Sequence, residues 1–171
     1  MRPTHDSRRI LLAARGWFIM LSFAVAFLFD LMPAVPGWPD WVAMVLTFWC
    51  VREPLRVGMA AGFLLGIAVD VADAALLGEH ALAYVLLAYA AGALSRRILW
   101  FSLSLQALHV LPLLLAVQCV AIGVRMLGGA GFPGWTVFLS GITAAALWIP
   151  LNYLLLLPQY QPVEKDENRP I

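Results

Sequence analysis

Long apolar runs separated by short polar breaks follow one another along nearly the whole chain. Six runs stand out, approximately at residues 16–31, 38–51, 55–77, 80–94, 99–127 and 135–157. A helix that spans the hydrocarbon core of a bilayer takes about 20 predominantly apolar residues. The pattern therefore predicts an all-α, polytopic integral membrane protein that folds as a six-helix transmembrane bundle.

The second run is short for a membrane span. As a helix, residues 38–53 would extend about 24 Å at about 1.5 Å per residue, against a hydrocarbon thickness of about 30 Å. Such a segment must thin the bilayer locally, borrow flanking residues, or re-enter from one side.

Composition leaves little room for anything outside the membrane. Of the 171 residues, 63% are hydrophobic and 12% are charged, whereas about a quarter of a soluble domain is charged. We therefore expect residues 1–171 to form a single transmembrane domain, with a core at about 10–158 and a disordered polar tail at 159–171. The net charge of +1 excludes a nucleic-acid binder, which needs a basic surface to neutralise phosphates.

The placement of the basic residues predicts the direction of the helices. Ten of the eleven Lys and Arg residues lie on alternate connections, namely Arg2, Arg8, Arg9, Arg15, Arg52, Arg56, Arg96, Arg97, Lys165 and Arg169. Basic residues close to span ends are retained in the cytoplasm. The alternation predicts six crossings with cytoplasmic N and C termini and favours a full crossing by the second run. Arg125 is the exception, on the outer side.

The third run carries small residues at a helical spacing. Gly58, Gly62 and Gly66 recur every four residues, and Asp70 continues the series. In lipid, such a seam lets another helix approach closely and gain van der Waals contact. Ordinary packing inside the bundle is the leading interpretation, and an interface with a partner protein is the alternative.

Asp70 and Asp73 are one helical turn apart and share a face. Exposure of such a carboxylate to lipid costs roughly 2.5 to 3.5 kcal/mol, so both should face protein or water. We predict that Arg125, on the same side of the membrane, pairs with Asp70 or Asp73. A neutralised structural pair is the leading interpretation, and a proton or ion site is the alternative.

The sequence offers no catalytic, cofactor or metal site. An intramembrane aspartyl protease needs carboxylates from different helices, whereas Asp70 and Asp73 share one and no other acid lies deep. Cys50 and Cys119 lie inside apolar runs, and the three histidines are scattered without the spacing of metal ligands. We therefore predict that the protein is not an enzyme and binds no cofactor.

Two further polar features remain. Gln106, His109, Gln118 and Asn152 lie within the last two runs, where we expect hydrogen bonds between helices. The cytoplasmic turn contains Arg52, Glu53, Pro54 and Arg56. Anchoring at the lipid headgroups would explain its arginines, and docking of a partner is the alternative.

The order of several short motifs resembles a known family. The motifs are Pro39-Asp40, Trp49, Arg52-Glu53-Pro54, Gly58, Phe63, Gly66, Asp70, Leu77-Gly78, His80-Ala81-Leu82-Ala83-Tyr84 and Trp148-Ile149-Pro150. In this order, and with this length and topology, the chain resembles the MreD family of rod shape-determining proteins over roughly residues 10–158.

The resemblance implies a non-enzymatic, multi-pass scaffold subunit of the bacterial elongation machinery in the inner (cytoplasmic) membrane. Such a subunit would bind MreC and act with RodA, a class B penicillin-binding protein and cytoplasmic MreB in cell shape and lateral peptidoglycan synthesis. Its other contacts would be with membrane lipid. The family is also similar in fold to the substrate-binding S components of energy-coupling-factor vitamin transporters, which is the alternative. Short, glycine-rich outer connections leave little to cover a vitamin and favour the scaffold.

Overall fold

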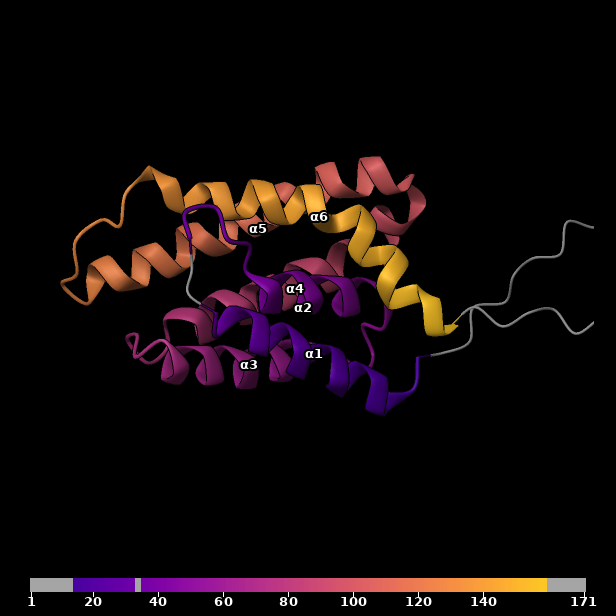
Figure 1. Cartoon of the computed structure of the whole chain (residues 1–171), viewed down its shortest axis with the longest axis horizontal. Coiled ribbons are helices and arrows are strands. Elements are labelled where there is room, and N and C mark those ends of the chain that lie inside the picture. The colour runs from indigo at the N-terminus through magenta and orange to yellow at the C-terminus, as the bar shows by residue number, and fades with distance from the viewer. Residues whose placement is uncertain (1–13, 33–34, 160–171) are drawn as a thin grey trace, which may run out of the picture.

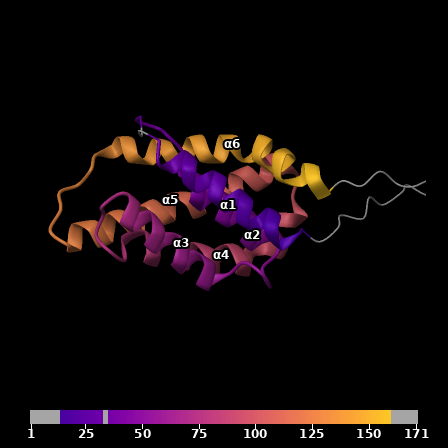
Figure 2. The ribbon, with the colours of Figure 1, turned by 60° about the horizontal axis from the view of Figure 1, so that its bottom comes forward.

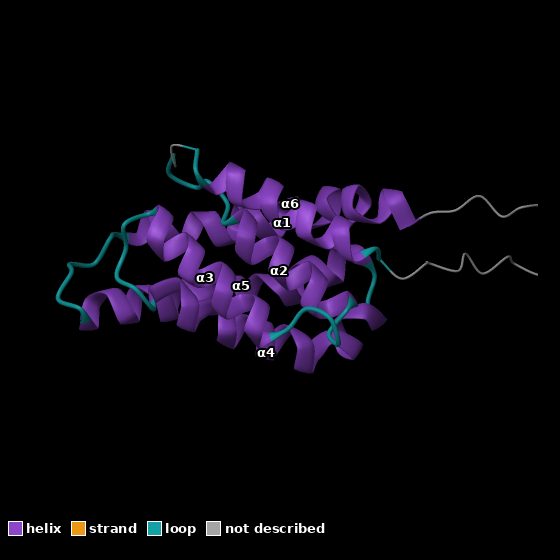
Figure 3. Ribbon diagram, turned by 90° about the horizontal axis from the view of Figure 1, so that it is seen from below, coloured by secondary structure: helices purple, strands orange, loops and turns teal. Residues whose placement is uncertain are grey.

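The computed structural model describes residues 14–32 and 35–159, and these fold into helices without any strand (Figures 1 and 3). The α-helices are α1 Gly16–Asp30, α2 Trp41–Arg52, α3 Met59–Ala72, α4 Glu79–Trp100, α5 Leu103–Leu127 and α6 Phe138–Leu156. Single 3-10 turns, Trp135–Val137 and Leu157–Gln159, flank α6. The six-helix, all-α bundle predicted from the apolar runs is confirmed.

The helices differ in their ability to cross a bilayer. Segments Glu79–Trp100, Leu103–Leu127 and Trp135–Gln159 are long and apolar enough to do so, whereas α1, α2 and α3 are shorter, with 15, 12 and 14 residues. Both described ends of the chain lie at the same end of the bundle (Figure 1), as an even number of crossings requires.

Successive helices run antiparallel, so charged residues separate towards the two ends of the bundle (Figure 1). One end, here called the basic end, carries Arg15, Arg52, Arg56, Arg96 and Arg97. The opposite end, here called the acidic end, is where α2 and α4 begin, and Arg125 lies there in the last turn of α5. The remaining basic residues of the alternation, Arg2, Arg8, Arg9, Lys165 and Arg169, lie outside the described residues, as does the polar tail beyond Gln159.

Helix α2 forms the centre of the bundle (Figure 2). Its residues Val42 to Val51 are all buried, each at most 3% exposed, and α1, α4, α5 and α6 all contact it. Within this core, the Trp49 indole nitrogen donates a hydrogen bond to the Ser22 hydroxyl of α1 at 2.8 Å. Because protein encloses α2, its length of about 18 Å need not match the thickness of the bilayer. Burial on all sides also explains an apolar sequence with no polar face.

Helices α3 and α4 pack with their backbones in contact. A Cβ atom on Gly62 would lie 2.6 Å from the Tyr84 carbonyl oxygen, and one on Gly66 would lie 2.4 Å from the Ala81 Cα. Gly58 precedes the helix as its N-cap, and a Cβ atom there would lie 4.0 Å from the Pro54 carbonyl oxygen, in ordinary van der Waals contact. Packing inside the bundle therefore occupies two of the three seam glycines, and Gly58 does not take part.

Two helix ends differ most from the apolar runs. Helix α3 ends at Ala72, five residues earlier than expected, and Ala74 then adopts a left-handed backbone conformation with φ of 50° that cannot continue a helix. Helix α4 continues through Arg96 and Arg97 to Trp100 instead of ending before them. Arginine is a good helix former and is favourable in the last turn, where the helix dipole is negative.

The contact between α3 and α4 predicts a strong response to added bulk. Gly66→Leu should lower the free energy of unfolding by about 1 to 3 kcal/mol, because overpacking against backbone atoms forces the helices apart. Denaturation of the purified protein measures this. Gly92→Leu is the matched control, since a Cβ at Gly92 meets nothing within 4 Å; equal stability of the two variants would contradict the packing argument.

Candidate functional site

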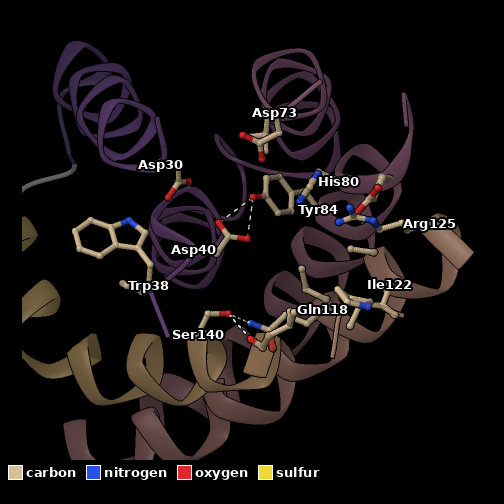
Figure 4. A pocket seen from close by; sticks show the side chains of 17 residues that line it. Asp30, Trp38, Asp40, Asp73, His80, Tyr84, Gln118, Ile122, Arg125 and Ser140 are labelled. Atoms are coloured by element: carbon tan, nitrogen blue, oxygen red, sulfur yellow. Dashed lines mark hydrogen bonds between the residues drawn. The ribbon is translucent and has the colours of Figure 1, made fainter. Parts of the chain in front are cut away.

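A cavity of about 360 Å³ opens at the acidic end of the bundle (Figure 4). We call it the acidic cavity. Its polar lining residues are Asp30, Trp38, Asp40, Asp73, Glu79, His80, Tyr84, Gln118, Arg125 and Ser140. A smaller cavity of about 270 Å³ adjoins it and shares Asp73, Glu79, His80 and Arg125. The lining combines four carboxylates with one arginine and one histidine.

Asp70 lies behind the cavity wall and caps the start of α4. One carboxylate oxygen accepts hydrogen bonds from the His80 backbone N–H at 2.8 Å and from the His80 ring Nδ1 at 2.8 Å. The other accepts from the Gly78 N–H at 2.8 Å and the Ala81 N–H at 3.4 Å. The side chain is fully buried. A carboxylate at a helix N-terminus satisfies orphan N–H donors and interacts favourably with the helix dipole.

Two further aspartates cap the start of α2. Asp30, the last residue of α1, accepts from the N–H groups of Trp41 and Val42 at 2.9 and 3.0 Å. Asp40 accepts from the Ala43 N–H at 2.7 Å, as the N-cap of its own helix. Its two oxygens also lie 2.8 and 2.9 Å from the Tyr84 hydroxyl, which donates to them from α4 (Figure 4). Carboxylates thus join α1 to α2 and α2 to α4.

His80 connects the two groups of aspartates. Its ring lies edge-on to the Tyr84 ring with centroids 5.8 Å apart, so Asp70, His80, Tyr84 and Asp40 form a continuous chain of contacts. Because an ionised carboxylate only accepts hydrogen bonds, Nδ1 of His80 carries a proton towards Asp70. The remaining ring nitrogen, Nε2, is then the one available on the cavity side.

The prediction that Arg125 pairs with Asp70 is wrong. Asp70 takes its partners from the first turn of α4, which offers several backbone donors in addition to the His80 ring. In the part of the chain that the structure describes, Arg125 lies within 4.0 Å of neither Asp70 nor Asp73. Arg125 and Asp73 do line the same cavity, so a pair between them stays a prediction.

The turn with Arg52, Glu53, Pro54 and Arg56 lies at the opposite, basic end and connects other segments. Arg52 donates to the Asn152 side-chain oxygen of α6 at 3.2 Å and lies over the Phe48 ring. Arg56 donates to the Ala14 carbonyl oxygen, just before α1, and lies 3.9 Å from Glu53. Pro54 follows α2 directly in this turn. The arginines therefore have contacts within the protein, besides any with lipid headgroups.

The polar residues of the last two helices divide into two pairs. Gln118 of α5 donates to Ser140 of α6, and Asn152 accepts from Arg52, so these two link different elements as expected. Gln106 instead donates to the Phe101 carbonyl oxygen, in the connection before its own helix. His109 lies 2.8 Å from the Leu105 carbonyl oxygen of the same helix.

Sequence reasoning missed most of the acidic cavity. Attention to Asp70 and Asp73 alone overlooks Asp30, Asp40 and Glu79, which converge on the cavity from separate elements. The role of Asp40 could have been predicted, since it directly precedes an apolar helix and aspartate is a preferred N-cap. Asp30 and Glu79 carry no such signal, because their neighbours in space are distant in the chain.

The cap at the start of α4 predicts a specific loss of stability. Asp70→Asn should lower the free energy of unfolding by about 1 to 3 kcal/mol, because an amide removes the charge and part of the accepting capacity at buried N–H groups. Asp73→Asn, one turn away and exposed, is the control and should leave stability nearly unchanged. Both are compared by denaturation, and a larger effect at Asp73 would refute the assignment.

Comparisons with known proteins identify the family of the chain. The model of the family described as rod shape-determining protein MreD matches residues 12–157. The rod shape-determining protein MreD of Haemophilus influenzae is 30% identical over 149 residues, which cover 82% of this chain and 89% of the relative. No solved structure gives a significant match. The chain therefore belongs to the MreD family of rod shape-determining proteins.

Proposed function

We propose that this chain is a non-enzymatic, multi-pass scaffold subunit of the elongation machinery in the bacterial inner membrane. In this role it binds MreC and acts with RodA, a class B penicillin-binding protein and MreB in rod shape and lateral peptidoglycan synthesis. The family match over residues 12–157 is the observation that carries the proposal.

The packing of the bundle supports a partner surface away from the glycine seam. Gly62 and Gly66 are already covered by α4, so a partner helix has no access to them. Helix α1 packs chiefly against α2 and presents large exposed side chains, among them Trp17, Met20 and Leu28. A contiguous apolar helix face of this kind suits either lipid or a membrane helix of a partner.

The bonding of the carboxylates supports a non-enzymatic role. Asp30, Asp40 and Asp70 each accept hydrogen bonds from helix N-termini through their carboxylates. An acid or base in catalysis must exchange protons with a substrate, which would remove these caps. These three aspartates thus have a structural role that competes with catalysis.

One observation favours the second candidate, a substrate-binding S component of a vitamin transporter. The acidic cavity, at about 360 Å³, falls within the range of about 300 to 1,000 Å³ that is typical of small-molecule sites. The two candidates predict different phenotypes and are separated by the experiment that follows.

Depletion of this protein from a rod-shaped host should produce round cells with disordered lateral wall synthesis, and the protein should copurify with MreC from native membranes. Microscopy with a fluorescent cell-wall label and identification of the copurified proteins provide the measurements. Complementation with the intact gene is the control. Rods of normal shape that require a vitamin for growth would reject the scaffold and support the transporter.

The proposed orientation places the basic end in the cytoplasm, because basic residues near span ends are retained there. A single cysteine at Arg96 should therefore resist a membrane-impermeant maleimide added from the periplasm, whereas one at Gly131 should react. Labelling is carried out after Cys119→Ser, because Cys119 is exposed, while Cys50 is buried. Reaction at position 96 in intact cells would overturn the orientation.

A further inference from the structure

Glu79 is the carboxylate of the acidic cavity that combines low exposure with the absence of any hydrogen bond from the described residues. Glu79 is only 5% exposed and lines both adjoining cavities. Among residues 14–32 and 35–159, no side chain or backbone group forms a hydrogen bond or an ion pair with its carboxylate. Its oxygens instead open into the cavities, where they can accept hydrogen bonds from a ligand without breaking a contact of the fold. Glu79 therefore points to a ligand with positive charge and hydrogen-bond donors.

The neighbours of Glu79 add charge of both signs. Asp73 is exposed at the rim of the cavities and accepts no hydrogen bond through its side chain from the described residues. Arg125 lines both cavities as well, beyond ion-pair distance of either acid. A simple cation would be attracted to the acids but repelled by Arg125. A ligand that carries an ammonium and an anionic oxygen group side by side complements all three residues.

The arrangement does not suit a metal ion instead. Within the described part of the chain, no group of three or more His, Cys, Asp and Glu side chains is placed to hold one. Asp30 and Asp40, the other two acids of the cavity, accept hydrogen bonds from the start of α2. Glu79 and Asp73 are left, and two carboxylates beside an arginine resemble a charge-paired organic site more than an oxygen cage.

The position of the cavity indicates where such a ligand comes from. Helix ends of a membrane bundle lie near the headgroups, and Trp and Tyr gather at that level. At this end, Trp135 is 80% exposed and pairs edge-on with Phe132 at 5.3 Å, and Trp38 lines the cavity. The cavity thus lies at the depth of lipid headgroups.

We infer that the acidic cavity binds a zwitterionic phospholipid headgroup with a primary ammonium, as in phosphatidylethanolamine. The ammonium lies against Glu79 and Asp73, and the phosphate lies against Arg125. A primary ammonium brings three N–H donors, which a quaternary choline headgroup lacks, so the site distinguishes ethanolamine from choline lipids. This inference is independent of the proposed scaffold role.

The test uses the full chain in nanodiscs of phosphatidylglycerol that contain equal small fractions of phosphatidylethanolamine and phosphatidylcholine. Native mass spectrometry after release in mild detergent measures which lipids remain bound. We expect the ethanolamine lipid to be retained about tenfold over the choline lipid, because hydrogen bonds to a charged group of this kind contribute strongly. Equal retention of all three lipids by the unaltered protein would refute the inference without any variant.

Matched variants locate the site. Glu79→Gln and Arg125→Gln should each abolish the preference, whereas Glu53→Gln and Arg97→Gln, at the basic end, should keep it. A preference that survives both cavity variants would refute the assignment.

Soluble phosphoethanolamine, added to protein in detergent, separates the lipid from a free zwitterion. Competition for the retained lipid by the soluble compound would support the headgroup chemistry. Binding of the soluble compound without retention of the lipid would overturn the lipid as the source.

Discussion

The structure depends on one requirement of the bilayer: the N–H groups at the start of a helix need acceptors where water is scarce. Aspartates supply them, two from other helices and one from the N-cap position of the helix itself. Asp30 and Asp40 accept from the start of α2, and Asp70 accepts from the start of α4. Each aspartate also joins two elements, so the same bonds that satisfy the backbone fix the ends of the helices together. This requirement accounts for three of the carboxylates at this end, Asp30, Asp40 and Asp70.

Close packing and capping depend on each other. Gly66 brings α3 into backbone contact with Ala81, and the Ala81 N–H is itself one of the donors to Asp70. A side chain at position 66 would separate the carboxylate from the turn that it caps. Helix α4, held in this way, then contacts α2, which is buried on all sides. The small residues of α3 therefore act mainly by placing a polar group correctly, beyond their van der Waals contact with α4.

The number and type of the helices could be predicted from the apolar runs, but several features could not. The burial of α2 inside the protein cannot be predicted from its sequence, because a helix surrounded by protein and one surrounded by lipid both have apolar residues on every side. The end of α3 depends on the backbone conformation of Ala74, and alanine carries no signal for it. Opposite charge predicts Arg125 as the partner of Asp70, because Arg125 is the one basic residue expected on that side. Backbone donors at a helix start compete for carboxylates equally well, and the sequence does not show that a carboxylate from another helix will accept from them.

Carboxylates therefore have two roles at the acidic end: some cap helices, and others remain available to a ligand. The number of hydrogen bonds that each carboxylate accepts from the protein distinguishes the two. Asp70, fully buried, accepts four hydrogen bonds, so its charge is compensated from within the fold. Glu79 is nearly as buried, at 5% exposed, yet it sits in the first turn of α4, where the helix dipole favours its charge without bonding its oxygens. The dipole makes this position favourable for a carboxylate in the absence of a bonded partner. A carboxylate without a bonded partner in the protein can accept hydrogen bonds from a ligand, because binding does not have to break any contact of the fold.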